Sequence, residues 1–189
     1  GGNGGIYRGL CLYNFADNHD VHRLASVLKE PEHQKNIYTL LYTMPGVPSI
    51  YYGSEWGVKG MQQKGSDAQL RPCLELGRIP DADESLLRHL QKLGKIRAGL
   101  PALQFGGYDQ CMVKNEQFAF RRTDGSNQAY VALNLAAHPE YVEFRVERSL
   151  LVDVFSGTRF ETNDGNLKLE LPAYGARILV PEADYAHLD

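Results

Sequence analysis

At 189 residues the chain is long enough for one large or two small domains with a buried core. Its 43% hydrophobic and 23% charged residues are typical of an ordinary globular protein. The net charge is −3, the basic residues are scattered, and no apolar run has the length of a membrane span. We therefore expect neither nucleic acid nor a membrane among its partners.

The three cysteines, Cys11, Cys73 and Cys111, are an odd number without metal-type spacing. This pattern is typical of free thiols that pack as small apolar residues. We therefore expect no metal site and no cofactor in this chain. The sequence leaves the localisation open, although the cysteine usage favours a reducing, cytoplasmic compartment.

The first hundred residues alternate between strand and helix patterns. Apolar runs predict buried strands over residues 10–15 and 48–52. Apolar residues at helical spacing predict helices over residues 31–44 and 83–97. The order strand, helix, strand, helix gives about two β/α units, which we assign to a first domain of residues 1–100.

Residues 56–78, between the second strand and the second helix, are polar and rich in glycine. A loop of this length in a compact domain is uncommon unless it is functional. After it, Asp81 or Asp83 is suited to cap the helix that begins near residue 83.

From about residue 101 the apolar period changes to two. The strand patterns lie at residues 117–121, 128–133, 141–146, 158–162, 167–171 and 174–180. Residues 163–166, Asn-Asp-Gly-Asn, predict a hairpin between the fourth and fifth of these strands. About eight short strands separated by turn residues predict an antiparallel β-sandwich, which we assign to a second domain of residues 101–189.

Residues 14–20, Asn-Phe-Ala-Asp-Asn-His-Asp, place polar groups where the first strand ends. Parallel α/β folds keep their chemistry at this end of the strands. Asp20 beside His19 could orient a substrate hydroxyl or take part in acid–base work. Asp20 could equally cap a helix, and the residues alone leave both interpretations open.

Two segments together carry a family resemblance. Residues 15–20, Phe-Ala-Asp-Asn-His-Asp, and residues 44–55, Met-Pro-Gly-Val-Pro-Ser-Ile-Tyr-Tyr-Gly-Ser-Glu, resemble the seventh and eighth strands of the glycoside hydrolase family 13 barrel, the α-amylase family. The resemblance is specific over residues 15–72 and architectural in the β half. It implies an α/β plus all-β fold: a partial (β/α)8 TIM barrel of about two β/α units, followed by an antiparallel β-sandwich.

The resemblance also implies roles for five residues. Asp20 matches the third essential carboxylate of the family, which holds hydroxyls of the sugar and helps to distort its ring toward the transition state. His19 is expected to hydrogen-bond the same sugar, and Asn18 to bind substrate or orient its neighbours. Asp67 and Arg71 resemble residues that border the sugar cleft, with a salt-bridged loop staple as the alternative.

Four neighbouring residues fit structural roles. We expect Asp17 to anchor its loop and Arg23 to pack in the loop or form an ion pair. Ser54 stands where many relatives carry Asp, so a charge role at this position is in doubt. Trp56 could stack on a sugar or pack in the core.

The implied parent is a retaining α-glucan-cleaving hydrolase of α-amylase or cyclomaltodextrinase type, acting on α-1,4-glucosidic bonds. An α-glucan transglycosylase or branching enzyme is the alternative. Its partners would be an α-glucan or maltooligosaccharide substrate and the upstream barrel segment of the same parent, with calcium possible there.

In that family the nucleophile and the acid lie on earlier strands, so we expect the chain alone to be inactive. The alternative of another class is a non-catalytic carbohydrate-binding or structural module, in which the β-sandwich supports folding or binds glucan. A third is that the two β/α units form an interaction platform.

Overall fold

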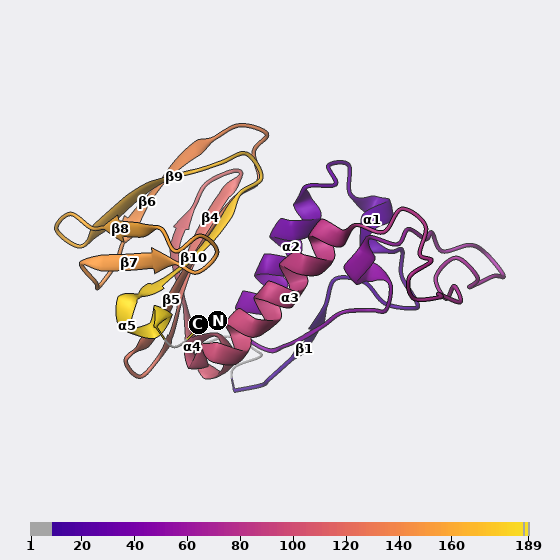
Figure 1. The fold of residues 1–189 in the computed structure, drawn as a ribbon, viewed down its shortest axis with the longest axis horizontal. Helices are drawn as coiled ribbons and strands as arrows, with labels where there is room; N and C mark the ends of the chain where they lie inside the picture. The colour runs from indigo at the N-terminus through magenta and orange to yellow at the C-terminus, as the bar shows by residue number, and fades with distance from the viewer. Residues whose placement is uncertain (1–8, 187, 189) are drawn as a thin grey trace. The chain divides into compact units, whose positions relative to one another are not determined.

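A computed structural model describes residues 9–186 and residue 188 (Figure 1). The chain divides into two compact units. Among the described residues, the first consists of residues 12–42 and 47–94, and the second of residues 9–11, 43–46, 95–186 and 188. The second unit therefore includes the short connection of residues 43–46 as well as the whole β-rich part of the chain.

The first unit has the predicted order of elements. Strand β1 (Tyr13–Phe15) pairs in parallel with strand β2 (Val47–Ser49). Helices α1 (Leu24–Val27) and α2 (His33–Thr43) connect them, and the short 3-10 helix η1 (Ser54–Trp56) and helix α3 (Glu84–Gly99) follow. The parallel pairing agrees with the prediction of β/α units.

The predicted burial of the two strands is wrong in this structure. The side chains of Tyr13 and Phe15 are 67% and 46% exposed, and Val47 is 50% exposed. Both strands are also shorter than the apolar runs of residues 10–15 and 48–52. A parallel strand is buried only where other elements cover both faces of its sheet, and here these side chains remain open to solvent.

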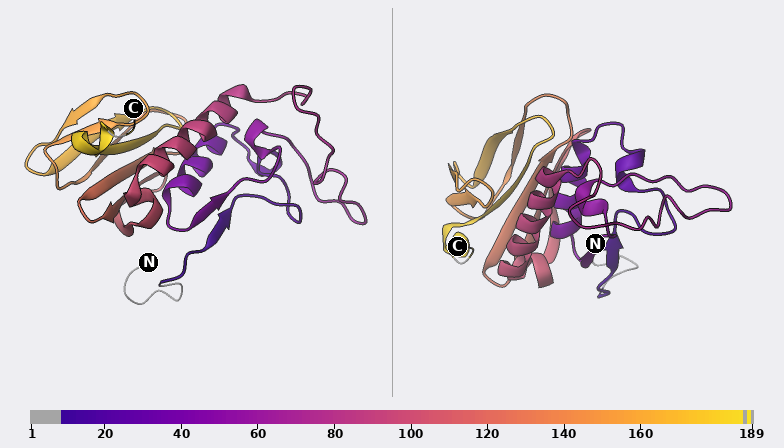
Figure 2. Two further views of the ribbon diagram at one scale, coloured as in Figure 1. Left: turned by 60° about the horizontal axis from the view of Figure 1, so that its bottom comes forward. Right: turned by 45° about the vertical axis from the view of Figure 1, so that its right-hand side comes forward.

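Helices α2 and α3 run side by side (Figures 1 and 2). The apolar stripe of α3 is buried as its spacing predicts, at Leu86, Leu90, Leu93 and Ile96. Asp83 begins the helix, because its Oδ1 accepts the backbone N–H groups of Ser85 and Leu86 at 2.9 and 3.0 Å. Partial burial would raise the pKa of Asp83, but these hydrogen bonds and that of the Ser85 hydroxyl lower it overall.

The β-rich part begins after the short helix α4 (Pro101–Phe105). Its strands are β3 (Gly107–Val113), β4 (Gln117–Asp124), β5 (Asn127–Asn134), β6 (Glu140–Arg145), β7 (Leu150–Asp153), β8 (Arg159–Glu161), β9 (Asn166–Leu171) and β10 (Ala176–Pro181). They form an antiparallel sheet in the order β3-β4-β5-β10-β7-β8 and a separate antiparallel pair, β6-β9. Helix α5 (Glu182–Tyr185) follows the last strand.

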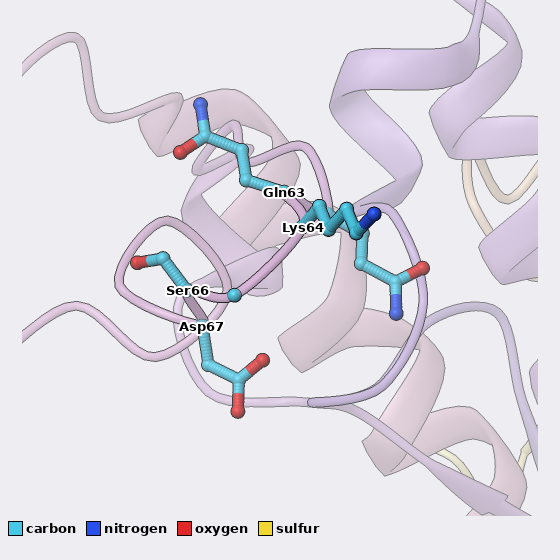
Figure 3. A pocket seen from close by; sticks show the side chains of 6 residues that line it. Gln63, Lys64, Ser66 and Asp67 are labelled. Atoms are coloured by element: carbon cyan, nitrogen blue, oxygen red, sulfur yellow. The ribbon is translucent and has the colours of Figure 1, made fainter.

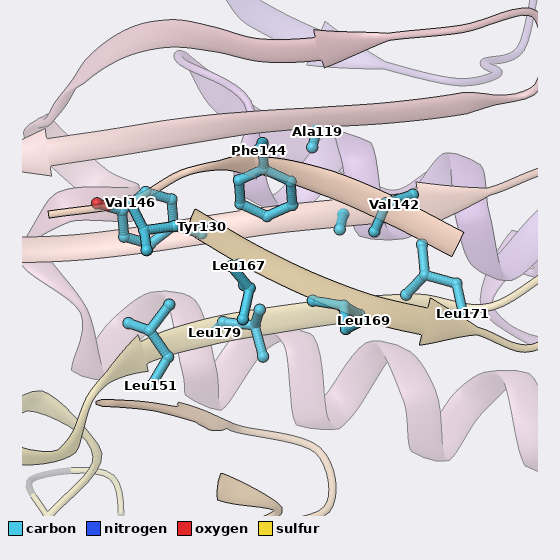
Figure 4. Packing of buried hydrophobic residues seen from close by; sticks show 11 residues of the cluster. Ala119, Tyr130, Val142, Phe144, Val146, Leu151, Leu167, Leu169, Leu171 and Leu179 are labelled. Atoms are coloured by element: carbon cyan, nitrogen blue, oxygen red, sulfur yellow. The ribbon is translucent and has the colours of Figure 1, made fainter. Parts of the chain in front are cut away.

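The core of this unit lies between the pair β6-β9 and the larger sheet (Figure 4). Alternate residues of β6 and β9, including Val142, Phe144, Leu167 and Leu169, are buried. They pack in one cluster with buried residues of the larger sheet such as Tyr130. Two layers with alternating inward-facing residues confirm the predicted β-sandwich.

The predicted hairpin around residues 163–166 is only half right. The reversal forms, because Asp164 and Gly165 both adopt positive φ and Asn163 bridges Asn166. However, β8 pairs with β7 and β9 pairs with β6, so the two flanking strands belong to different sheets. Turn residues specify where the chain reverses, whereas the burial of each strand's apolar face decides its partner.

Candidate functional site

The carboxyl ends of β1 and β2 bring two loops together. The strands pair in parallel with Phe15 opposite Ser49, so the segments that follow them, residues 16–23 and 50–56, leave the sheet at the same end. The long loop of residues 57–83 starts from the same place. This end of the sheet therefore gathers every segment in which the sequence analysis finds candidate site residues.

Asp17 forms the buried foundation of the site. Its carboxylate accepts the Ser54 hydroxyl at 2.8 and 3.0 Å and the backbone N–H of Leu24 at 2.8 Å. These bonds join the loop after β1 to the one after β2 and start helix α1. They confirm the anchoring role expected for Asp17, and they give Asp17 the capping contact that the sequence alone could have assigned to Asp20.

Arg23 fastens the long loop to this foundation. Its side chain is fully buried and donates to the carbonyl oxygens of Tyr52 at 2.8 Å and Leu70 at 2.9 Å. Its backbone N–H donates to the carbonyl of Gly60 at 2.9 Å, and its guanidinium lies 4.6 Å from the centre of the Tyr51 ring. The expected packing role is confirmed, and no sugar could reach this side chain.

The five candidate site residues lie together above this foundation. Asp20 Oδ2 is 3.2 Å from His19 Nε2, and Asp20 Oδ1 is 3.4 Å from Arg71 Nη2. The same nitrogen of Arg71 is 3.3 Å from Asp67 Oδ2. Asn18 Oδ1 accepts the backbone N–H of Asp20 at 2.8 Å, which fixes the turn that presents the carboxylate.

This cluster can bind a polar ligand because it is open to solvent. The Asp20 side chain is 67% exposed and that of His19 is 53% exposed. A carboxylate offers acceptors only, whereas the guanidinium of Arg71 offers donors only. Adjacent hydroxyls, each both donor and acceptor, suit such a surface. The ion pair between Asp67 and Arg71 within the loop is also formed. Arg71 therefore contacts both the loop and Asp20.

Next to the cluster, the loop is hollowed (Figure 3). Residues 62–67 line a polar hollow of about 540 Å³, to which Gln63, Lys64, Ser66 and Asp67 contribute side chains. Asp67 lines this hollow and also contacts Arg71. The hollow therefore adjoins the exposed cluster.

Sequence reasoning missed two residues that support the site. His22 Nδ1 accepts the backbone N–H of Gln62 at 2.8 Å, and the Tyr52 hydroxyl donates to the carbonyl of Pro72 at 2.9 Å. Both hold the long loop against the strand ends. No spacing in the sequence points to either contact, because each joins residues 20 or more positions apart.

The described part of the chain holds neither a metal-binding cluster nor a membrane-crossing helix. Over residues 9–186, no group of three or more His, Cys, Asp or Glu side chains is arranged to hold a metal ion. Over the same residues, the helices lack the combination of length and apolar character that crossing a membrane requires.

Family models match both parts of the chain. Residues 7–75 match the catalytic domain of alpha amylase, and residues 110–178 match the C-terminal domain of maltogenic amylase. The chain belongs to the α-amylase family. Together with the fold, the two matches confirm a C-terminal portion of this family, with part of a barrel followed by a β domain.

Individual relatives of this α-amylase-family chain support the same assignment. A cyclomaltodextrin glucanotransferase of Bacillus sp. (strain 38-2) is 31% identical over 122 residues, which cover 64% of this chain and 16% of the relative. A cyclomaltodextrinase of Geobacillus thermopakistaniensis (strain MAS1) is 26% identical over 170 residues, covering 87% of this chain and 28% of the relative. The crystal structure of an Anoxybacillus alpha-amylase superposes with a TM-score of 0.80 at 27% identity, covering 89% of this chain and 37% of that one. The chain thus spans 16% to 37% of the length of these relatives.

Proposed function

We propose that this chain supplies one wall of the sugar-binding site of an α-glucan-cleaving enzyme of the α-amylase or cyclomaltodextrinase type. The observation that supports the proposal most is the exposed Asp20 carboxylate, held between His19 and Arg71 at the carboxyl end of β1. In this proposal residues 1–100 belong to the catalytic barrel and residues 101–189 to its supporting β domain.

Each cluster residue has a distinct task in this proposal. The Asp20 carboxylate accepts hydrogen bonds from neighbouring hydroxyls of the sugar at the cleavage point, and these bonds strengthen as the ring distorts toward an oxocarbenium-like transition state. His19 hydrogen-bonds the same sugar. Arg71 holds the Asp20 carboxylate in place through their ion pair, while Asn18 fixes the backbone turn. The upstream barrel segment of the parent would supply the nucleophile and the acid.

The decisive experiment replaces Asp20 in the complete parent protein. Asp20→Asn keeps the size of the side chain but removes its charge, so we expect kcat on maltooligosaccharides to fall by about a thousandfold or more. Asp124→Asn, an exposed substitution in the turn between β4 and β5, is the matched control and should retain full activity. A loss smaller than tenfold for Asp20→Asn would remove Asp20 from the catalytic set.

The chain by itself should release no reducing sugar from maltooligosaccharides. Glycoside hydrolysis of this kind needs a pair of carboxyl groups that flank the bond, and Asp20 matches neither member of that pair. Turnover by the purified 189-residue chain that Asp20→Asn leaves unchanged would show that a different set of residues does the work.

Transfer of a glucan chain is a second candidate, because the relatives include a cyclomaltodextrin glucanotransferase. Product analysis of the parent with maltooligosaccharide and added glucose as an acceptor separates the two. Hydrolysis yields mainly shorter free sugars. A transferase instead converts the acceptor into longer or cyclic products.

A further inference from the structure

We propose that His22 is a pH-sensitive positioning residue, which in its neutral form holds residues 62–67 of the long loop beside the cluster at Asp20 and releases them when its ring is protonated. These six residues, the loop tip, line the polar hollow of about 540 Å³ (Figure 3). That the hollow receives part of an α-glucan rests on the proposed function.

One hydrogen bond carries the proposal, because it joins the segment after β1 to the loop tip. The backbone N–H of Gln62 donates to Nδ1 of His22 at 2.8 Å. Beside this bond, the backbone N–H of Arg23 donates to the carbonyl of Gly60 at 2.9 Å, so the two segments run next to each other. Among the described residues, His22 supplies the only hydrogen bond that reaches the loop tip from outside the long loop.

This bond requires the neutral ring of His22. An imidazole nitrogen accepts a hydrogen bond only when it carries no proton, whereas an imidazolium donates from both nitrogens. Protonation therefore places a donor on Nδ1, opposite the N–H of Gln62, and the bond is replaced by a contact between two donors. Histidine is the side chain that ordinarily changes its charge between about pH 5 and pH 8, so this exchange falls in the working range of many enzymes.

The partner that senses the charge of His22 is the N–H of Gln62. The ring is exposed, and in the described part of the chain it takes part in no ion pair. Asp20 and Asp67 are both paired with Arg71. The charged and titratable side chains of the two segments that the bond joins are those of Asp17, His19, Asp20, Arg23, Lys59, Lys64, Asp67 and Arg71.

The two ends of the loop tip are held by contacts that do not depend on His22. On one side, the backbone N–H of Gly60 donates to the Ser26 hydroxyl at 2.8 Å. On the other, the guanidinium of Arg23 donates to the carbonyl of Leu70 at 2.9 Å. A serine hydroxyl stays neutral and an arginine stays charged throughout this pH range. Loss of the His22 bond therefore frees the tip between Gly60 and Leu70 and leaves its two ends in place.

Release of the tip should weaken substrate binding more than the chemical step. Asp67 belongs to the tip, lines the hollow and contacts Arg71. The backbone turn that presents Asp20 is instead fixed by Asn18, on the segment after β1. A freed tip must be ordered again whenever a sugar binds, so KM rises while kcat changes little.

Two substitutions in the complete parent separate the charge of His22 from its shape. His22→Asn carries an oxygen on Cγ, where histidine carries Nδ1, so it keeps an acceptor that cannot be protonated. His22→Leu removes the acceptor. At about pH 7.5 we expect His22→Leu to raise KM for maltooligosaccharides about three- to tenfold, as the loss of one hydrogen bond implies, and His22→Asn to stay near the unaltered value. His138→Asn, at an exposed position, is the matched control.

The same kinetics at about pH 5 test the role of the charge. The unaltered parent should now approach His22→Leu, whereas His22→Asn should keep its lower KM. The ratio of KM in the unaltered parent to KM in His22→Asn is the quantity to follow, because the titration of the catalytic carboxyl groups is common to both proteins and cancels. We expect this ratio to rise from about 1 to about 3 or more between the two pH values.

Hydrogen exchange in the 189-residue chain measures the contact without any substrate. At about pH 7.5 the amide of Gln62 should exchange several-fold more slowly in the unaltered chain and in His22→Asn than in His22→Leu. At about pH 5 the unaltered chain should lose this protection, and His22→Asn should keep it. Each comparison is made at one pH, so the intrinsic pH dependence of exchange cancels.

Two outcomes would overturn the proposal. One is equal exchange at Gln62 in the unaltered chain and in His22→Leu at about pH 7.5. The other is a KM ratio between the unaltered parent and His22→Asn that is the same at both pH values. Should His22→Leu fail to fold, the comparison of the unaltered protein with His22→Asn at the two pH values decides by itself.

Failure of this proposal is distinguishable from failure of the proposed function. The proposed function fails if the parent keeps its activity in Asp20→Asn, and the exchange at Gln62 does not depend on that result. The proposal for His22 fails if the exchange or the KM ratio is insensitive to pH in a parent that Asp20→Asn inactivates.

Discussion

The hydroxyl of Ser54 donates to the carboxylate of Asp17, 2.8 Å from Oδ2 and 3.0 Å from Oδ1. Arg23 Nη1 in turn donates to the same hydroxyl oxygen at 3.3 Å. One small side chain thus bridges a buried anion and a buried cation. An Asp at position 54 would place a second buried carboxylate beside Asp17, which serine avoids.

Removing the Asp17 carboxylate should destabilise the fold. Asp17→Ala leaves the Ser54 hydroxyl, the Leu24 N–H and the buried Arg23 guanidinium without their acceptor or countercharge. We expect the free energy of unfolding to fall by about 3 kcal/mol. Urea titration followed by Trp56 fluorescence measures this, with the exposed Glu30→Ala as control. A loss below 1 kcal/mol, on the order of one ordinary hydrogen bond, would show that the bridge is dispensable.

Replacing Arg71, unlike replacing Asp17, should affect activity and leave stability nearly unchanged. Its contacts with Asp20 and Asp67 are exposed, and exposed ion pairs contribute about 0–1 kcal/mol. Arg71→Met should therefore leave the thermal midpoint nearly unchanged while raising KM or lowering kcat of the parent on maltooligosaccharides. If Arg71→Met is stable and leaves both KM and kcat unchanged, Arg71 has no role in substrate binding.

Arg122 should matter for stability, although it lies far along the chain from the site. Its buried guanidinium donates to the carbonyl oxygens of Thr43, Leu103, Gly106 and Gly107. Burial, and next the neighbouring Arg97, lower its pKa to about 10. We expect Arg122→Met to cost about 3 kcal/mol, because those carbonyls lose their donors.

Calorimetry of Arg122→Met, Arg122→Lys and the exposed control Arg148→Met checks this. Lysine keeps the charge but cannot match the fork of donors, so it should fall between the other two. Equal stability of Arg122→Met and Arg148→Met would contradict the assignment.

His89 should make the fold sensitive to acid. Burial is the main reason that its pKa falls from 6.5 to about 4, and the charges of Lys35 and Lys92 add to the effect. The unfolded chain binds a proton at higher pH than the folded one, so stability falls as the pH drops from about 6.5 to about 4. After discounting for partial exposure, we expect the contribution at pH 5 to be about 1 kcal/mol.

Urea titrations at pH 7 and pH 5 measure this difference. His89→Gln should reduce the acid-induced loss of stability, whereas His138→Gln, at an exposed position, should not. Identical pH dependence in both variants would place the sensitivity elsewhere.

Local sequence patterns predicted the helices, strands and turns of this fold better than they predicted which strands pair. The apolar stripe of α3 and its cap at Asp83 follow from spacing within a few residues, and both are found. Residues 163–166 likewise predicted a reversal. The pairing of β8 with β7 instead depends on which faces are buried in three dimensions, and a local pattern does not contain that information.

In the candidate site, too, residues adjacent in the sequence were predicted, whereas contacts between distant residues were not. The family resemblance of residues 15–20 pointed to Asp20, whereas these residues alone left a helix cap equally open. The contact between Asp20 and Arg71 joins residues 51 positions apart and depends on how the long loop folds back.

The open apolar side chains of Tyr13, Phe15 and Val47 bear on how this chain can be handled. Strands with such surfaces readily adhere to one another when many copies are present. Dilute samples are therefore the suitable starting point, and a preparation that clouds on concentration would reflect crowding of these strands rather than a failure of the β-sandwich to fold.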